Sequence, residues 1–146
     1  MVKGLGHVVL KVRSLDRSAA FYRDALGLRE VARNPEDRMV FFTAEGSGAH
    51  HDLALIEVGS GAPGPDPRAV GLFHVAFRVG SHLDDLRRAR LEGHGVTIRG
   101  MSDHLVSQSL YFSEPDGNML ECYVDADPAI CREKPELVAT TRPLAL

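Results

Sequence analysis

The chain has 146 residues, of which 44% are hydrophobic and 25% are charged, and its formal net charge at pH 7 is -3. These fractions are ordinary for a globular protein with a buried core, so they exclude a disordered or fibrous chain. The weak charge and the absence of long basic or long apolar runs exclude nucleic acid and the membrane as expected partners.

The first predicted element is a strand at 7–12, which is rich in β-branched residues. A helix follows it, which Ser14 or Asp16 can cap at the N-terminus and which Gly27 can end. After this helix the apolar pattern predicts further strands at about 28–33, 38–44 and 51–58. The first half of the chain therefore has the predicted order βαβββ.

A linker at 60–70, rich in Gly and Pro, separates this half from a second half with the same order. The second half begins with a strand at 74–79, and its helix ends at Gly93 or Gly95. Its remaining strands are predicted at 96–100, 108–113 and 119–124. The tail from 126 to 146 is polar and irregular, and we expect it to wrap either the body of the protein or a neighbouring molecule.

The two halves are copies of one pattern, because GLGHVVLKV at 4–12 matches GLFHVAFRV at 71–79. Neither copy is large enough to close a core alone. We therefore predict one α+β domain over residues 1–146, made of module one at about 4–59 and module two at about 71–125. The modules would form a cupped mixed β-sheet around a central site, with the helices outside.

Cysteine usage indicates the compartment. The only two cysteines, Cys122 and Cys131, form neither a disulfide framework nor a paired CxxC zinc site. Cys122 lies in an apolar stretch, which predicts a buried core thiol. The N-terminal apolar stretch is too short for a secretory signal, so we expect a cytoplasmic protein.

Three residues are candidate metal ligands: His7, His74 and Glu121. The two histidines occupy equivalent repeat positions, so a pseudo-twofold axis would aim both at one point. A carboxylate among the apolar residues of the last strand is costly to bury unless it is paired or bound to a cation. Two imidazoles and one carboxylate suit Fe(II), and Mn(II) also fits. Duplication of a structural histidine is the alternative interpretation.

These motifs resemble the vicinal oxygen chelate superfamily, which includes glyoxalase I, bleomycin and fosfomycin resistance proteins, and extradiol ring-cleavage dioxygenases. The resemblance runs from about 4 to 125 and is carried by GHVVLKV, SAAFYRDALGL, HHDLALIEV, GLFHVAFRV and YFSEPDGNMLECYVD. It implies paired βαβββ modules and a metal held by His7, His74 and Glu121. It also implies a homodimer, because modules of this superfamily commonly pair.

Three further residues are similar to those of the extradiol branch. His51, in HHDLAL, resembles a histidine that faces the oxygen-binding position, and His104 resembles one that hydrogen-bonds the bound diol. Tyr111 resembles a tyrosine near the substrate oxygen. The resemblance implies an Fe(II)-dependent dioxygenase that cleaves a catechol-like aromatic diol with O2. The small-molecule partners of the protein would then be the diol and O2. His51 would act on oxygen-derived intermediates, while His104 and Tyr111 orient and deprotonate the diol.

Two other functions stay open. A glyoxalase I-like lyase or isomerase with Zn(II) or Ni(II) would need a second carboxylate in the first half, where Asp52 and Glu57 bracket the expected position. An antibiotic-resistance protein would bind a drug in a groove or modify it, and a fosfomycin-type transferase would use Mn(II) and a cationic pocket. Arg78 and Arg99 are the candidates for that pocket. The chain has a single module pair, whereas extradiol enzymes of the longer type have two.

Overall fold

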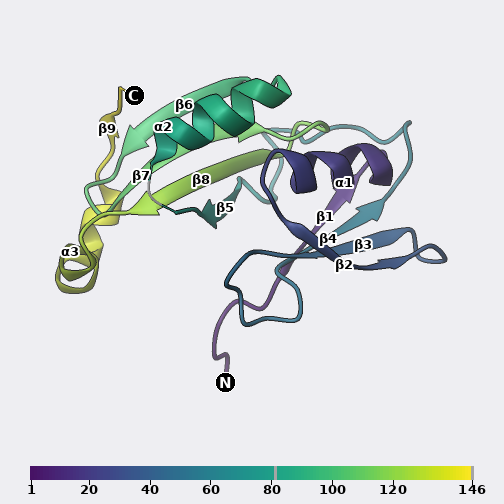
Figure 1. Ribbon diagram of the computed structural model, residues 1–146, viewed down its shortest axis with the longest axis horizontal. Helices are drawn as coiled ribbons and strands as arrows, with labels where there is room; N and C mark the ends of the chain where they lie inside the picture. Colours follow the sequence, from purple (N-terminus) through teal and green to yellow (C-terminus); the bar gives the residue numbers. More distant parts are fainter. Residues whose placement is uncertain (81, 146) are drawn as a thin grey trace. The chain divides into compact units, whose positions relative to one another are not determined.

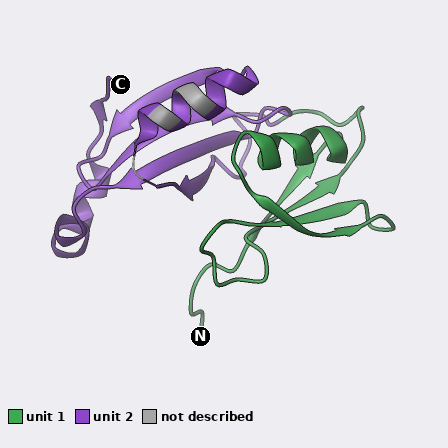
Figure 2. Ribbon diagram, in the orientation of Figure 1, with its two compact units in different colours: residues 1–64 green, residues 65–146 purple. Residues whose placement is uncertain are grey.

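The computed structural model describes residues 1–80 and 82–145, and its two compact units span residues 1–64 (unit 1) and 65–146 (unit 2) (Figure 2). Each unit combines one β-sheet with helices, so the predicted α+β class is confirmed. Within the described ranges, no helix has the length and apolar character needed to cross a membrane.

Unit 1 has the predicted order βαβββ (Figure 1). Its sheet has the strand order β1-β4-β3-β2, in which β1 and β4 run parallel and the other neighbours are antiparallel. The elements are β1 (Val8–Val12), α1 (Leu15–Asp24), β2 (Arg29–Asn34), β3 (Met39–Thr43) and β4 (Leu53–Glu57).

The core of unit 1 lies between α1 and one face of this sheet. Leu10 and Val12 of β1 are buried, whereas Val9 between them is exposed, as the alternation of side chains along a strand requires. Tyr22 of α1 packs on Phe42 of β3, with ring centroids 6.2 Å apart. The opposite face of the sheet is therefore free of the helix.

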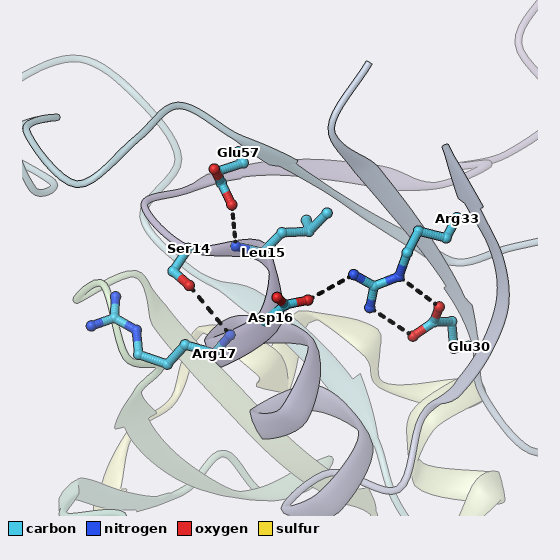
Figure 3. A network of polar contacts seen from close by, with 7 residues as sticks. All are labelled: Ser14, Leu15, Asp16, Arg17, Glu30, Arg33 and Glu57. Carbon is cyan, nitrogen blue, oxygen red and sulfur yellow. Dashed lines mark hydrogen bonds and ion pairs between the residues drawn. The ribbon is translucent and has the colours of Figure 1, made fainter. Parts of the chain in front are cut away.

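The N-terminus of α1 is held by two side chains (Figure 3). Ser14 is the N-cap, as predicted, and its Oγ accepts a hydrogen bond from the backbone N–H of Arg17 at 3.4 Å. Glu57, at the end of β4, accepts a second bond from the N–H of Leu15 at 2.7 Å and also pairs with Arg38. These bonds hold the pKa of the Glu57 carboxyl below its usual range.

The other predicted cap, Asp16, has a different partner. Its Oδ1 lies 2.9 Å from Nη1 of Arg33, whose Nε also binds Glu30 at 3.0 Å (Figure 3). Asp16 therefore ties the first turn of α1 to β2 instead of capping the helix. At the far end of the helix, Gly27 has a φ of 73°, which allows the turn into β2 at little cost.

Unit 2 repeats the βαβββ order and adds a C-terminal segment (Figure 1). Its sheet has the order β5-β8-β7-β6-β9, and β5 runs parallel to β8. The elements are β5 (Val75–Arg78), α2 (Leu83–Asp85), η1 (Leu86–Leu91), η2 (Glu92–His94), β6 (Ile98–Asp103), β7 (Ser107–Ser113), β8 (Met119–Asp125), α3 (Pro128–Glu133), η3 (Pro135–Ala139) and β9 (Arg142–Pro143).

The helix of unit 2 is less regular than its counterpart in unit 1. It changes from an α-helical turn to a π-helical stretch at Leu86–Leu91 and ends in a 3-10 turn. Gly95, with a φ of 71°, ends it, which decides between the two glycines that the sequence offers. Two of its own side chains, Leu83 and Leu91, are buried. Ser81, which matches Ser14 in the repeat, lies outside the described residues.

The C-terminal tail lies along unit 2. Its start is fixed by a hydrogen bond from the N–H of Ala126 to the carbonyl of Val106 at 2.8 Å. Its end adds β9 to the sheet, where Ser102 of β6 pairs with Pro143. Of the two predicted courses, the tail therefore takes the one along its own body. The sequence predicted neither α3 nor β9.

The predicted core thiol is confirmed. Cys122 in β8 is fully buried, and burial raises its pKa to about 12. The thiol therefore stays protonated at physiological pH, as expected of a structural core residue.

Replacing Glu57 with Gln tests the anchor at the start of α1. A carboxyl with a lowered pKa stabilises the fold above its unfolded value, about 4.3, and this stabilisation is lost as the pH falls through the folded value. We expect Glu57→Gln to lower the free energy of unfolding in urea at pH 7 and to differ less from the wild type at pH 3. Glu45→Gln, at an exposed loop position, is the control. An equal loss at both pH values would contradict this account.

Candidate functional site

Four of the six predicted site residues come together in unit 2. Tyr111 of β7 and Glu121 of β8 are direct neighbours in the antiparallel register, and His74 precedes β5, which pairs with β8. Paired residues project from the same face of a sheet, so these three side chains share one face. His104 follows β6 and reaches Tyr111 from the next strand. These four residues are the ones that the sequence assigned to the site from the second half of the chain.

The centre of this group is the contact between His74 and Glu121. Nε2 of His74 lies 2.9 Å from Oε2 of Glu121. Glu121 is buried, with 8% of its surface exposed. Nδ1 of His74 is also buried and has no hydrogen-bond partner among the described residues. The imidazole therefore presents its Nε2 edge to the carboxylate.

The other oxygen of Glu121 is held by two hydroxyl groups. Oγ of Ser109, which is fully buried, donates to Oε1 at 2.5 Å, and the hydroxyl of Tyr111 lies 3.3 Å from the same oxygen. These contacts fix the rotation of the carboxylate, so Oε2 faces His74. The sequence did not reveal Ser109 as a site residue. Its only signal is its position two residues before Tyr111, on the same face of β7.

His104 connects the group to the C-terminal tail. Its Nδ1 lies 2.8 Å from the backbone carbonyl of Thr140, and its Nε2 lies 3.0 Å from the hydroxyl of Tyr111. A carbonyl oxygen only accepts hydrogen bonds, so Nδ1 carries the proton that joins it to Thr140. In the neutral imidazole, Nε2 is then an acceptor, so it competes with Oε1 of Glu121 for the single hydrogen of the Tyr111 hydroxyl.

Tyr111 is a neutral phenol in this setting. Burial raises the pKa of its hydroxyl, and the neighbouring Glu121 carboxylate raises it further. A neutral phenol donates one hydrogen bond and accepts others. Tyr111 can therefore donate its one hydrogen to Glu121, to His104 or to a substrate oxygen, but it does not act as a phenolate base near neutral pH.

The pair of His74 and Glu121 fits a divalent metal ion. Two ligand atoms at about 2.1 Å from one ion and at right angles lie about 3.0 Å apart. The observed 2.9 Å between Nε2 and Oε2 is close to this separation. An imidazole nitrogen and a carboxylate oxygen suit Fe(II), Mn(II), Zn(II) and Ni(II). Within the described residues, neither unit by itself gathers three His, Cys, Asp or Glu side chains that could hold an ion.

The remaining two predicted site residues belong to unit 1. His7 directly precedes β1, and its ring centroid lies 4.2 Å from that of His51 and 6.4 Å from that of His50. Desolvation lowers the pKa of His51, and the neighbouring imidazoles lower it further. The environment therefore favours the neutral form of His51. The ring of Phe41 packs edge-on against the ring of His51, with the two ring centroids 5.2 Å apart.

Asp52 fixes the loop that carries His51. Its carboxylate accepts hydrogen bonds from the N–H of Ala44 at 2.8 Å and from the hydroxyls of Ser47 and Thr43 at 2.7 and 3.1 Å. Burial alone would raise the pKa of Asp52, but these bonds lower it. Asp52 therefore holds the ends of the loop together and positions His51 through the backbone.

The residues that would support the alternative functions are engaged elsewhere. The Glu57 carboxylate binds the start of α1, and the carboxylate of Asp52 binds its own loop. Neither is free to supply the additional ligand of a lyase. Arg78 is exposed, and its Nη1 lies 3.6 Å from Oδ2 of Asp125. Arg99 is exposed on β6, so both arginines lie on the surface, as expected.

A comparison with known families matches residues 4–122 to the family described as the Glyoxalase/Bleomycin resistance protein/Dioxygenase superfamily. The chain belongs to this superfamily. The match includes every strand of the βαβββ pattern in both units and ends within β8, next to Glu121. The superfamily membership that the motifs implied is therefore confirmed.

Named relatives in the superfamily have more than one activity. The chain is 37% identical over 122 residues to catechol-2,3-dioxygenase of Bacillus subtilis, covering 83% of this chain and 41% of that protein. It is 38% identical over 124 residues to biphenyl-2,3-diol 1,2-dioxygenase 3 of Rhodococcus globerulus, covering 83% and 63%. It is 33% identical over 138 residues to glutathione transferase FosA of Serratia marcescens, covering 92% of each. The chain thus spans less than two thirds of the two dioxygenases.

Solved structures confirm the fold of the superfamily. A glyoxylase/bleomycin resistance protein/dioxygenase domain from Frankia sp. EAN1pec has a TM-score of 0.71 and 28% identity, covering 86% of this chain and all of that one. Lactoylglutathione lyase from Agrobacterium tumefaciens has a TM-score of 0.63 and 26% identity, covering 85% and 95%. The fold is therefore shared by proteins with different reactions, so the reaction must be argued from the site.

Replacing His104 with Ala tests its bond to the tail. Loss of a hydrogen bond worth about 1 kcal/mol would raise local opening about fivefold. We expect faster hydrogen exchange in a peptide covering residues 137–143. His94→Ala is the matched control, because His94 binds the carbonyl of Arg90 at the end of the unit 2 helix. Unchanged exchange in His104→Ala would show that the tail is held without this contact.

Proposed function

We propose that this protein is an Fe(II)-dependent extradiol-type dioxygenase that cleaves a catechol-like aromatic diol with O2. The observation that carries the proposal is the connected set of His104, Tyr111, Glu121 and His74 on one sheet face. This set places a phenol and an imidazole acceptor beside two metal-binding groups. The two dioxygenase relatives support the same reaction class.

In this proposal His7, His74 and Glu121 hold the ion, with Mn(II) as the next choice after Fe(II). When bound, the ion would supply Lewis acidity that favours the ionised diol and a redox centre for the reaction with O2. Relatives named as manganese-dependent and iron-dependent dioxygenases make both metals plausible. The buried Glu121 requires a positive partner, and a divalent ion provides one.

Tyr111 and His104 would act together on the diol. Tyr111 donates its hydroxyl hydrogen to a diol oxygen and so orients the ring. His104 holds its Nδ1 proton against the Thr140 carbonyl, so Nε2 is the nitrogen that can accept a proton once the Tyr111 hydroxyl turns its hydrogen to the diol. We therefore assign the proton acceptance to His104 and the orienting hydrogen bond to Tyr111.

His51 would serve the oxygen side of the reaction from unit 1. Its neutral form can take up a proton and its protonated form can stabilise developing negative charge. Asp52 keeps the loop of His51 in place, so the imidazole needs little reorganisation. We also propose a cytoplasmic homodimer as the working form, because modules of this superfamily commonly pair and the two cysteines are free thiols, as is usual in a reducing compartment.

A fosfomycin-type thiol transferase is the second candidate, because the FosA relative and this chain cover 92% of each other. Such an enzyme would need cationic side chains to hold a phosphonate. Arg78 and Arg99 are exposed, and Arg78 lies beside Asp125. This arrangement favours the dioxygenase.

Anaerobic loading with Fe(II), followed by O2 and a panel of catechols, tests the reaction. We expect O2 uptake and a yellow ring-fission product from the wild type. His74→Ala should lose the bound metal and at least about a thousandfold in kcat/KM. His94→Ala, on the surface, should keep both.

Two outcomes would contradict the dioxygenase. The first is conversion of the hemithioacetal of methylglyoxal and glutathione without O2 uptake, which would identify a lyase. The second is addition of glutathione to fosfomycin in the presence of Mn(II). Normal metal content in His74→Ala would contradict the ligand assignment separately from the reaction.

Replacing Ser109 with Ala tests how the carboxylate of Glu121 is positioned. Removal of an outer-shell hydrogen bond to a ligand weakens metal binding about 10- to 100-fold. We expect the Kd for Fe(II) or Mn(II) to rise by about this factor, with partial recovery in Ser109→Thr. Ser113→Ala, on the same strand, should leave the Kd within about twofold of the wild type. Equal metal affinity in Ser109→Ala would show that the hydroxyl does not position the ligand.

A further inference from the structure

The turn between β6 and β7 carries His104 and contains a residue with strained backbone. Beyond the last paired residues of the two strands, the N–H of His104 bonds the carbonyl of Ser107 at 2.8 Å. Leu105 and Val106 therefore form a two-residue loop directly after His104. Leu105 has a φ of 67°, in the left-handed region. Hairpin loops of this length favour glycine at a position with positive φ, because a Cβ makes that conformation costly.

The side chain of Asp103 spans the backbone of His104. Its Oδ1 accepts a hydrogen bond from the N–H of Leu105 at 2.7 Å, so the carboxylate closes a turn that has His104 at its centre. The main chain of Asp103 is itself fixed, because it pairs with Gln108 of β7 on one side and with Arg142 of β9 on the other. The side-chain bond therefore restrains the φ and ψ angles of His104, and with them the direction of its ring.

The C-terminal tail holds the same turn on both sides of the strained residue. On one side, Nδ1 of His104 bonds the carbonyl of Thr140 at 2.8 Å. On the other side, the carbonyl of Val106 accepts hydrogen bonds from the N–H of Ala126 at 2.8 Å and from Sγ of Cys131 at 3.3 Å. A costly backbone conformation persists only where its surroundings fix it from several directions. The strain is therefore maintained directly next to the imidazole of the candidate site.

The orientation of the His104 ring decides both of its polar contacts in the site. Its two nitrogens lie 2.8 Å from the Thr140 carbonyl and 3.0 Å from the Tyr111 hydroxyl. Hydrogen bonds weaken steeply when their angle falls below about 120°. A rotation of the His104 backbone would therefore break both contacts together, and Nδ1 would no longer be held in its protonated form.

We propose that Asp103 is a positioning residue for His104, because its carboxylate holds the strained turn in the shape that aims the imidazole at Tyr111. Without this bond, the strain at Leu105 would relax by a change to negative φ, and the ring would leave its two partners. The part of His104 as proton acceptor rests on the proposed function, whereas its orientation does not.

The tautomer of His104 reports this orientation without metal, substrate or reaction. In metal-free protein at about pH 8, above the ordinary imidazole pKa, long-range proton–nitrogen correlation spectra distinguish a ring protonated at Nδ1 from one protonated at Nε2. His104→Gln identifies the signals. We expect the Nδ1–H form in the wild type and a rise of at least about tenfold in the ratio of Nε2–H to Nδ1–H in Asp103→Ala. Asp103→Asn keeps an acceptor oxygen and should retain the wild-type tautomer.

Two further variants separate positioning from a general loss of stability. Asp66→Ala is the matched control, because Oδ1 of Asp66 accepts the same kind of bond from the N–H of Arg68 at 2.8 Å in the linker. It should leave the His104 tautomer unchanged. Asp103→Ala combined with Leu105→Gly should recover the Nδ1–H form at least in part, because glycine adopts a positive φ without strain. An unchanged tautomer in Asp103→Ala, an equal change in Asp66→Ala, or no recovery in the double variant would overturn the proposal.

Turnover gives the second test. In the Fe(II)-loaded protein, Asp103→Ala should lower kcat for catechol at least about tenfold and leave KM within about twofold, because proton acceptance is impaired while the metal ligands are intact. Asp103→Asn should restore kcat. A rise in KM alone would overturn the positioning role. A changed tautomer in Asp103→Ala, with no turnover of any diol by the wild type, would support the positioning role and overturn only the proposed reaction.

Discussion

The site depends on one buried carboxylate. Glu121 lies in the middle of a hydrophobic strand, where an unpaired charge would cost several kcal/mol. Ser109 and Tyr111 bind one of its oxygens, and His74 faces the other. This division gives the two oxygens different tasks, because one keeps the side chain in place and the other is presented to a cation. Strands β7 and β8 pair in the register that places Tyr111 opposite Glu121, so the sheet itself aligns these side chains.

The two copies of the repeat have diverged in what they contribute. In unit 1, the end of the fourth strand carries Glu57, whose carboxylate anchors the start of a helix. In unit 2, the corresponding strand carries Glu121, whose carboxylate faces His74. The same backbone pattern thus uses one acid for stability and the other for the candidate site. The two acids do not occupy equivalent positions. Ala54 pairs with Val9 as Glu121 pairs with Ala76, so the residue of β4 that corresponds to Glu121 is an alanine.

Much of the fold follows from local sequence. The alternation of apolar residues predicted every strand of the repeat, and Ser14 was recognisable as a cap because its hydroxyl suits the first turn of a helix. His74 and Glu121 could be proposed from the repeat and from the cost of a carboxylate in an apolar strand, whereas Tyr111 could be added to them only through the resemblance to extradiol enzymes. Ser109 could not be found, since a serine facing a carboxylate has the same local pattern as a serine facing water. The π-helical stretch and β9 depend on tertiary contacts, which no local pattern encodes.

The contact between His104 and Thr140 uses the main chain of the tail. A backbone carbonyl is present at every residue, so the contact constrains the path of the tail but not the identity of residue 140. The tail can therefore change in sequence during evolution while it keeps the imidazole in one tautomer. Shortening or rerouting the tail would release this histidine even when all its sheet neighbours are intact. The tautomer of His104 is in this way tied to the path that the main chain takes past the sheet at residue 140.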